Sequence, residues 1–375
     1  MKKNKFFLIT TVPMSLSFFK GQIGKLSKDF DITLISSPSE ELEQIAHSEN
    51  VKSTAISMKR DISIIDDIVS LLKILWLFII QRPDVIHCNT PKASLLSLVA
   101  GFFLKIPVRI YYVHGLRYEG ASGKKRKFLI AIEKISCFCA TDIIAVSYGV
   151  RKEVESVLTS KKVSVIHHGS PNGLNIKDFS VKSYDLKAIR DEYSINKEDF
   201  VFGFVGRLVG DKGINELVHA FNKLEQRNIK LLLIGRYETN LDPLKQETLD
   251  IIKENPNIIE FGFQSDVKKF LSIMDLFVSP SYREGFGLSV LEANLMQIPV
   301  LVSKITGYSE IVIEDKNGFF INSKNENDLY EKMNELLESK SKLIAMKKKC
   351  RSEVVVKYDH ESVLKHALLY YSQFK

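Results

Sequence analysis

The feature that most constrains the fold is a regular alternation of short apolar runs and longer helix-like segments, which occurs twice along the 375 residues. The first series has strand-like runs at residues 6–12, 32–36, 85–87, 108–113, 143–146 and 163–166, separated by helix-like segments at 15–28, 62–81, 93–104, 124–139 and 150–158. The second series has strand-like runs at 200–205, 231–234, 258–261, 276–279 and 299–302, and two helices at 326–347 and 360–374 follow it. Such alternation is typical of βαβ units and parallel sheets. The sequence therefore predicts an α/β protein with two Rossmann-like parallel-sheet domains.

A polar segment rich in turn-forming residues separates the two series and lacks a long apolar run. It predicts an N-terminal domain over 1–168, a linker over 169–198 and a C-terminal domain over 199–355. Residues 356–375 are predicted as a C-terminal helix that could cross back to the N-terminal domain. Open α/β sheets bind ligands at the carboxyl ends of their strands, so we expect the two domains to face a central cleft.

The composition is that of an ordinary globular protein, with 45% hydrophobic and 26% charged residues. The formal net charge of +8 favours anionic partners. Nucleic acid is not the expected partner, because no basic stripe with interleaved aromatic residues stands out. The four cysteines are too few and too irregularly spaced for a disulfide framework or a zinc site, which fits a reducing cytoplasm.

The longest apolar run, residues 68–80, contains the single tryptophan, Trp76, and is interrupted by Lys73. It falls short of the roughly 20 residues that span a bilayer, so a buried or interfacial helix is expected. Core burial is the favoured interpretation for the helix around Trp76.

A glycine-rich segment, GRLVGDKG at 206–213, follows the first strand of the second domain and leads into a helix. Neither G-x-G-x-x-G nor a P-loop motif occurs in the chain, which argues against a dinucleotide oxidoreductase and a P-loop NTPase. Glycines allow the backbone to approach a ligand, and Arg207 and Lys212 could straddle a diphosphate at the helix N-terminus. The alternative is a loop with two solvated basic residues, and this string alone does not decide between them.

The segment PSYREGFGLSVLEA at 280–293 follows another strand and begins a helix near Gly287. Glu284 precedes that helix and Glu292 lies within it, so that both carboxylates can address one ligand. Carboxylate oxygens accept hydrogen bonds and therefore suit sugar hydroxyls. The alternative places Glu292 on the helix surface and makes Glu284 a partner of the helix dipole.

These motifs, together with LLLIGRYE at the end of the second strand of that domain, resemble the retaining glycosyltransferases of family 4, which have the GT-B fold. YYVHGLRYE and GSPNGLN resemble the subgroup that builds capsule, O-antigen and related surface glycans. The resemblance covers nearly the whole chain.

The resemblance implies a role for each matching residue. It implies that Arg207 and Lys212 bind the donor diphosphate, that Glu284 holds the donor sugar and that Glu292 binds the ribose. His114, at the end of the strand IYYVH, matches a family histidine that contacts the donor sugar. The further donor-binding residues implied are Gly206, Gly235, Gly285, Phe286, Gly287 and Leu288. The sequence departs from the family at 11–14, where many members have a Gly-Gly pair and this chain has Thr-Val-Pro-Met.

The activity implied is transfer of a hexose or N-acetylhexosamine from a nucleotide diphosphate, UDP being expected, with retention at the anomeric carbon. No protein nucleophile, metal or other cofactor is expected, since the nucleotide sugar is itself a substrate and no metal-ligand spacing occurs at a strand end. The expected acceptor is a polyprenyl-diphosphate-linked saccharide. Two alternatives stay open, a sugar-nucleotide 2-epimerase of the same fold and a non-catalytic subunit that binds sugar nucleotides.

A basic run precedes an apolar helix in the first domain and comprises Lys124, Lys125, Arg126 and Lys127. Such runs attract anionic membranes at about 1 kcal/mol per residue. This predicts a membrane or acceptor contact and a cytoplasmic protein held peripherally at the inner face of the cell membrane. The alternative is an ordinary solvated helix start.

Overall fold

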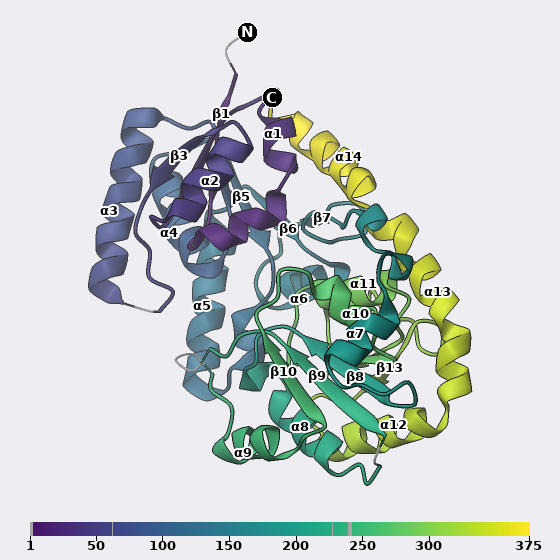
Figure 1. The fold of residues 1–375 in the computed structure, drawn as a ribbon. Coiled ribbons are helices and arrows are strands. Elements are labelled where there is room, and N and C mark those ends of the chain that lie inside the picture. Colours follow the sequence, from purple (N-terminus) through teal and green to yellow (C-terminus); the bar gives the residue numbers. More distant parts are fainter. Residues whose placement is uncertain (1–2, 62, 227, 239–241) are drawn as a thin grey trace. The chain divides into compact units, whose positions relative to one another are not determined.

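The computed structural model describes residues 3–61, 63–226, 228–238 and 242–375. It divides into two compact units (Figure 1). Unit 1 comprises Met1–Gly173 and His360–Lys375, and unit 2 comprises Leu174–Asp359. Each unit is built around its own parallel sheet, which confirms the predicted fold class.

In the described part of unit 1, seven parallel strands form a sheet in the order β3-β2-β1-β4-β5-β6-β7. The order reverses direction between β1 and β4, as in a doubly wound sheet. The strands are β1 Lys5–Ile9, β2 Asp31–Ser36, β3 Lys52–Ala55, β4 Val85–Cys88, β5 Val108–Val113, β6 Asp142–Ala145 and β7 Val163–Val165.

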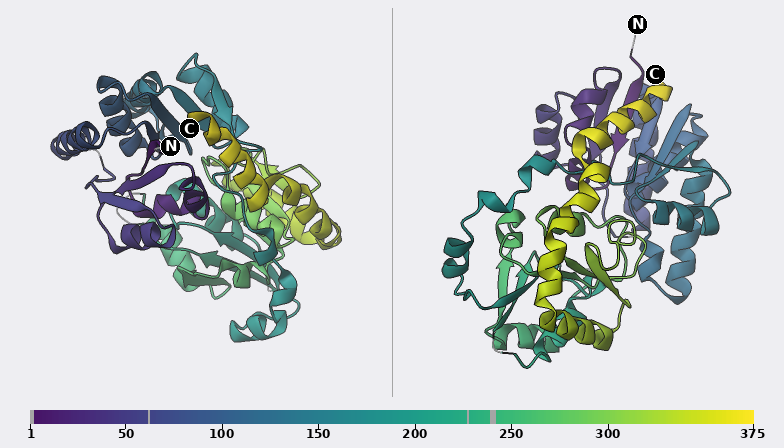
Figure 2. Two further views of the ribbon diagram at one scale, coloured as in Figure 1. Left: turned by 90° about the horizontal axis from the view of Figure 1, so that it is seen from above. Right: turned by 90° about the vertical axis from the view of Figure 1, so that its right-hand side faces the viewer.

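Helices cover both faces of this sheet, as the alternating side chains of β1 show. Phe6 packs against Phe30 and Tyr371 on one face, whereas Phe7 packs against Phe78 of α3 on the other. The helical segments of unit 1 are η1 Pro13–Phe19, α1 Gln22–Leu26, α2 Glu40–Ser48, α3 Ile64–Gln81, α4 Pro91–Phe103, η2 Arg117–Gly120, α5 Gly123–Cys139, α6 Tyr148–Val157, α14 His360–Tyr371 and η6 Ser372–Phe374. Figure 2 shows α14, the yellow end of the chain, returning to unit 1, where it packs against α1.

In the described part of unit 2, six parallel strands form a sheet in the order β10-β9-β8-β11-β12-β13. The strands are β8 Phe200–Val205, β9 Ile229–Ile234, β10 Ile258–Gly262, β11 Leu276–Ser279, β12 Val300–Ser303 and β13 Gly318–Ile321. The helical segments are η3 Ile176–Asp178, η4 Val181–Ser183, α7 Leu186–Glu192, η5 Gly210–Lys212, α8 Ile214–Asn222, α9 Gln246–Glu254, α10 Val267–Leu271, α11 Leu288–Leu295, α12 Glu326–Glu338 and α13 Lys340–Tyr358. Phe200, Phe202 and Phe204 alternate along β8 and all enter one hydrophobic core.

The structure differs from the sequence-based expectation in several elements. The helix expected at 15–28 is divided into η1 and α1, because Gly21 between them has a positive φ of 77°. The helix expected at 326–347 ends at Glu338, and α13 begins directly after Ser339. The sequence analysis predicted neither α2 nor β3. The strand β3 is four residues long and largely exposed, and no apolar run marks it.

The expectation of core burial at Trp76 is wrong, because this side chain is 66% exposed. In the described residues, no helix combines the length and the hydropathy required to cross a bilayer.

Candidate functional site

The first candidate site begins where β8 and β9 end in unit 2. The Gly206 amide donates to the Ile234 carbonyl at 2.9 Å, and a Cβ on Gly235 would overlap the Gly206 carbonyl. The two strand ends therefore approach each other so closely that only glycine fits at position 235. This contact fixes the start of the segment 206–213.

The same segment abuts the loop that follows β11. Gly213 lies between η5 and α8 with a φ of 72°, and a Cβ there would overlap the carbonyl oxygen of Pro280. The Gly213 contact thus brings the basic loop of β8 against the acidic loop of β11, and the Gly235 contact holds the start of the basic loop beside the end of β9.

Lys212 and Glu284, selected from two separate motifs, meet at this junction. The Lys212 ammonium donates a hydrogen bond to Glu284 Oε1, and their side chains are only 16% and 21% exposed. Because little water surrounds the pair, the attraction between its two charges is stronger than in an ion pair at the surface. The cation is therefore held beside the start of α11 by a carboxylate that an incoming anion would have to displace or share.

Tyr308, which the sequence analysis did not select, holds this loop in place. Its hydroxyl lies 2.6 Å from Ser279 Oγ, donates to Ser281 Oγ at 3.1 Å and reaches Glu284 Oε1 at 3.4 Å. Its ring is fully buried, and burial raises the pKa of its hydroxyl well above the usual value, so the hydroxyl stays protonated and can donate. No motif marks this residue, because its role depends on contacts with residues 24 to 29 positions away.

Arg207 lies at a more exposed position than Lys212. Its guanidinium pairs with Glu238 at 2.7 Å and approaches Asp211 Oδ1 at 4.0 Å, and the side chain is 40% exposed. The neighbouring Asp211 also pairs with Arg283 at 2.7 Å. Both cations of the basic loop are thus held by acidic side chains.

The helix α11 begins at Leu288, one residue after Gly287, close to the position predicted from the sequence. Gly287 has a φ of 84°, and Phe286 is buried with its ring 5.2 Å from that of Tyr358. The Phe286 side chain therefore anchors the loop in unit 2, and only its backbone can take part in ligand binding. Gly307 packs equally closely, since a Cβ there would lie 2.5 Å from the Glu284 carbonyl oxygen.

Glu292 lies on α11, and its carboxylate has no hydrogen bond or ion pair to another described residue. Burial raises the pKa of this carboxyl group to about 7, and the positive charge of Lys268 partly opposes the shift. Of the two interpretations of Glu292, this environment favours a ligand-binding carboxylate over a solvated helix residue.

The second candidate site lies in unit 1, where β4 and β5 end side by side. His114 Nε2 is 3.0 Å from Asn89 Oδ1, Asn89 Nδ2 is 3.0 Å from His87 Nδ1, and His87 Nε2 is 2.8 Å from the Tyr371 hydroxyl. These four side chains form a hydrogen-bonded series, and the sequence analysis selected only His114 from it. Asn89 and His87 could have been found, because they stand at the end of the neighbouring strand.

The hydrogen bonds of Asn89 determine which histidine nitrogens carry protons. Its amide group donates to His87 Nδ1, and its carbonyl oxygen can accept only from a protonated His114 Nε2. Burial lowers the pKa of His87 to about 3 and that of His114 to about 4, so both rings are neutral at pH 7. His114 Nδ1 is therefore an acceptor, and it is buried without a partner among the described residues.

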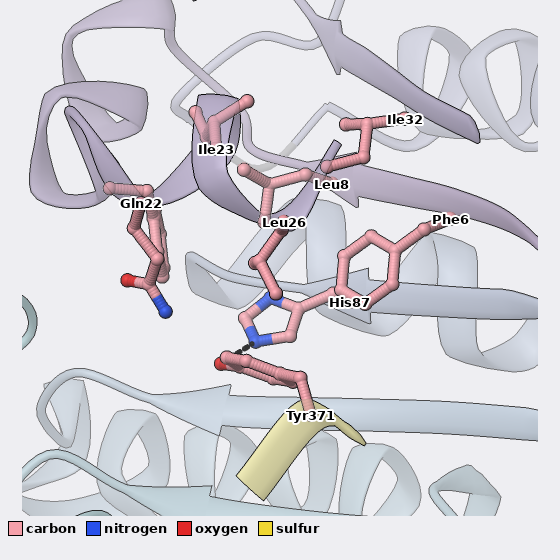
Figure 3. Close-up of a pocket in the computed structure, with 9 residues that line it drawn as sticks. Phe6, Leu8, Gln22, Ile23, Leu26, Ile32, His87 and Tyr371 are labelled. Carbon is pink, nitrogen blue, oxygen red and sulfur yellow. Dashed lines mark hydrogen bonds between the residues drawn. The ribbon is translucent and has the colours of Figure 1, made fainter. Parts of the chain in front are cut away.

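A small cavity adjoins His87 in unit 1 (Figure 3). Its volume is about 10 Å³, room for one water at most. Its lining consists of Phe6, Leu8, Phe19, Gln22, Ile23, Leu26, Ile32, His87 and Tyr371. The cavity is too small and too apolar to hold a substrate.

The loop after β1, which departs from the family pattern, is held by Thr11. The Thr11 amide donates to Thr90 Oγ1 at 2.9 Å, and the Ala93 amide at the start of α4 donates to Thr11 Oγ1 at 3.2 Å. A threonine that caps a neighbouring helix thus occupies the position of the Gly-Gly pair.

The predicted basic run lies at the exposed N-terminus of α5. Lys124, Lys125 and Lys127 make no ion pair with a described residue, and the Arg126 guanidinium lies 5.5 Å from the centre of the Tyr118 ring. Among the residues that the structure describes, no group of three or more His, Cys, Asp or Glu side chains is arranged to hold a metal ion.

Comparison with known proteins identifies both units. Residues 26–170 match the model described as Glycosyltransferase Family 4, and residues 185–353 match the model described as Glycosyl transferases group 1. The chain is 35% identical over 347 residues to the capsular polysaccharide biosynthesis glycosyltransferase CapM of Staphylococcus aureus, a match that covers 91% of this chain and 90% of that protein.

Two further proteins extend the comparison. The UDP-Gal:alpha-D-GlcNAc-diphosphoundecaprenol alpha-1,3-galactosyltransferase of Escherichia coli is 27% identical over 342 residues, covering 88% of this chain and 85% of that one. The crystal structure of Anabaena Alr3699/HepE in complex with UDP and glucose superposes with a TM-score of 0.81 at 18% identity, over 99% of this chain and all of that one. This last likeness identifies the fold as GT-B, and the match to CapM over nine-tenths of both chains shows that the protein is a glycosyltransferase of family 4.

Proposed function

We propose that this glycosyltransferase moves a hexose or N-acetylhexosamine from a UDP-sugar to a lipid-linked saccharide, with retention at the anomeric carbon, in the synthesis of a surface polysaccharide. The observation that carries the proposal is the Lys212–Glu284 pair, tied to the buried Tyr308 at the start of α11. Two relatives support the substrate classes, since CapM acts in capsule synthesis and the Escherichia coli enzyme uses UDP-Gal and a diphosphoundecaprenol acceptor.

In this proposal Lys212 and Arg207 stabilise the diphosphate as it leaves. The reaction develops negative charge on the leaving group, and fixed cations in a poorly solvated site lower the energy of that charge. Each cation is already oriented by a carboxylate, Glu284 for Lys212 and Glu238 for Arg207. The arriving diphosphate would share each cation with its carboxylate or displace that carboxylate.

The acidic side chains are proposed to bind hydroxyl groups. Glu284, with the backbone of Gly285 to Gly287, would hold the donor sugar, and the unpaired carboxylate of Glu292 would accept hydrogen bonds from the ribose diol. His114 would accept a hydrogen bond from a donor-sugar hydroxyl at Nδ1, the nitrogen that Asn89 leaves unprotonated. The central cleft expected from the sequence stays a prediction.

The mechanism proposed has no protein nucleophile. The leaving phosphate itself would take the proton of the attacking acceptor hydroxyl, on the same face of the sugar from which it departs, which retains the configuration. No metal is assigned to this step, and transfer is expected to persist in excess EDTA. Loss of transfer on chelation, restored by magnesium or manganese, would require a metal-assisted step.

The test is a panel of nucleotide sugars measured first by thermal stabilisation and then by transfer. A donor at 100 times its dissociation constant stabilises the native protein by about 2.7 kcal/mol. We expect a UDP-sugar to give this effect in the wild type and in the Lys332→Ala control, whose lysine also forms an ion pair, but not in Lys212→Ala. Incubation with a polyprenyl-diphosphate saccharide should then give an α-linked product.

Two results would redirect the proposal. Conversion of the donor without an acceptor would indicate the 2-epimerase. Binding of the donor without turnover on any lipid-linked or soluble saccharide would indicate a binding subunit.

A further inference from the structure

The helix α3 exposes an almost entirely apolar face. Nine of its residues are exposed, and eight of them are apolar: Ile64, Ile65, Ile68, Val69, Leu72, Trp76, Ile79 and Ile80, with Lys73 as the ninth. The exposed fractions of the eight range from 45% to 78%. A helix of a soluble protein normally shows charged and polar residues on this side.

The exposed residues lie on one side of α3 at helical spacing, opposite the buried Ser70, Ile74, Leu77 and Phe78. The buried side attaches the helix to unit 1, where Phe78 packs on Phe7 of the sheet. The apolar face is therefore not part of the core of unit 1. An apolar surface that extends along an 18-residue helix marks an interaction site.

The same layer of helices carries a second exposed apolar group. α3 packs against α4, and α4 packs against α5 (Figure 1). At the end of α4, Phe102 is 39% and Phe103 is 73% exposed, and the Phe102 ring lies 5.5 Å from that of Phe138 on α5, which is 66% exposed. Exposed phenylalanines of this kind are typical of helix faces that lie in the boundary between lipid headgroups and acyl chains.

The charges of this layer identify the kind of partner. Four cations stand in the first turns of α5, where the positive end of the helix dipole disfavours them, and no acidic residue offsets them in its first turn. Lys124, Lys125 and Lys127 make no ion pair with the described residues of the chain. A partner with negative charge over a broad surface would relieve this repulsion.

We propose that the exposed face of α3 inserts into the interfacial region of an anionic lipid bilayer, with the helix parallel to the membrane surface. This rests on the proposed function, since a lipid-linked acceptor requires the enzyme to work at a membrane. The apolar side chains enter the boundary between headgroups and acyl chains, Trp76 lies among the headgroups, and Lys73 reaches back to the phosphates. The basic cluster of α5 adds electrostatic attraction over a longer range. The main contact is the insertion of α3, because its apolar side chains enter the lipid.

Trp76 allows a direct test, because it is the single tryptophan of the chain and lies on this face. Its fluorescence is measured while the full-length protein is titrated with vesicles of phosphatidylglycerol and phosphatidylcholine at 1:1. We expect the emission to shift to shorter wavelength and to be quenched when the lipids carry brominated acyl chains. Unchanged emission at saturating lipid would overturn the proposal.

Matched variants separate the apolar contact from the charge. Ile65→Ser with Leu72→Ser removes two exposed apolar side chains of α3 and keeps the reporter, and we expect vesicle affinity to fall at least tenfold. Ile344→Ser with Val356→Ser, on the exposed surface of α13, removes a similar amount and should leave the affinity unchanged. Equal losses in the two pairs would contradict a specific role for α3.

Replacing Lys124, Lys125 and Lys127 with Gln should weaken binding to the anionic vesicles, and salt should do the same to the wild type. The shift in emission at saturation should persist in both cases, because the apolar insertion is retained. Loss of the shift itself in this variant would show that the charges alone hold the protein to the vesicle.

The other occupant of such a face would be a second copy of the chain. Sedimentation without lipid tests this, and a dimer that dissociates in the Ile65→Ser, Leu72→Ser variant would overturn the proposal.

Transfer to a short-chain, water-soluble acceptor separates this inference from the proposed function. Normal transfer without vesicle insertion contradicts only the membrane face, whereas insertion without transfer contradicts only the activity.

Discussion

Substitution of Gly287 by alanine should destabilise unit 2 for two reasons, a strained backbone conformation and a collision with a buried ring. Gly287 has a φ of 84°, and this left-handed conformation costs a residue with a Cβ about 1–2 kcal/mol. The new Cβ would also lie 2.6 Å from two ring carbons of Tyr308. Forcing a buried side chain to move in this way costs about 1–3 kcal/mol. The expected total is about 2–5 kcal/mol.

Gly262 provides the matched control for the backbone part. It also has a positive φ, 60°, but a Cβ there would meet no atom within 4 Å. Gly262→Ala should therefore cost only about 1–2 kcal/mol. The difference between the two variants measures the collision with Tyr308.

The assay is unfolding in guanidinium followed by circular dichroism, with Trp76 fluorescence as an internal reference, because Trp76 belongs to unit 1. The Trp76 transition should be the same in both variants. In a Tyr308→Ala background the cost of Gly287→Ala should fall to that of Gly262→Ala, since the ring it would strike is gone. Equal costs for the two glycines in the wild-type background would refute the reasoning.

Three further predictions concern activity. Lys212→Ala and Arg207→Ala should each lower kcat more than tenfold without unfolding the protein, because each removes a cation from the leaving diphosphate; turnover within twofold of wild type would exclude that residue from the role. Affinity for a UDP-sugar, measured by calorimetry, should rise between pH 6 and pH 8 as the Glu292 carboxyl loses its proton near its raised pKa of about 7, and Glu292→Gln should abolish the rise. Asn89→Asp places a carboxylate beside His114 and should raise the pKa of that ring from about 4, so that an acidic limb enters the pH profile of kcat/KM; a profile identical to wild type would show that Asn89 does not control His114.

The parts of the site that lie next to one another in the sequence were predictable. The strand ends, the glycine-dependent turns and the start of α11 depend on local spacing, so Lys212, Glu284 and Gly287 could be selected as candidates from the motifs. Tyr308 could not be selected, because its role depends on which loops the fold brings together. Asn89 carried only an indirect signal, its position directly after the strand that neighbours the strand of His114.

The error at Trp76 has a different cause. A helix that is apolar all round has the same sequence whether its second side faces a protein core or a membrane. The run 68–80 therefore showed that α3 would be apolar, but it contained no information about what covers the exposed side.

The return of α14 to unit 1 has a consequence for the order of events during protein synthesis. Unit 2 is one continuous segment, so it can fold as soon as Leu174–Asp359 has left the ribosome. Unit 1 cannot, because Tyr371 fills its interior beside His87 and Phe6 and is translated only after the whole of unit 2. The N-terminal 173 residues must therefore wait with an incomplete core while the rest of the chain is made, and this is the period in which we expect chaperones to bind the nascent protein.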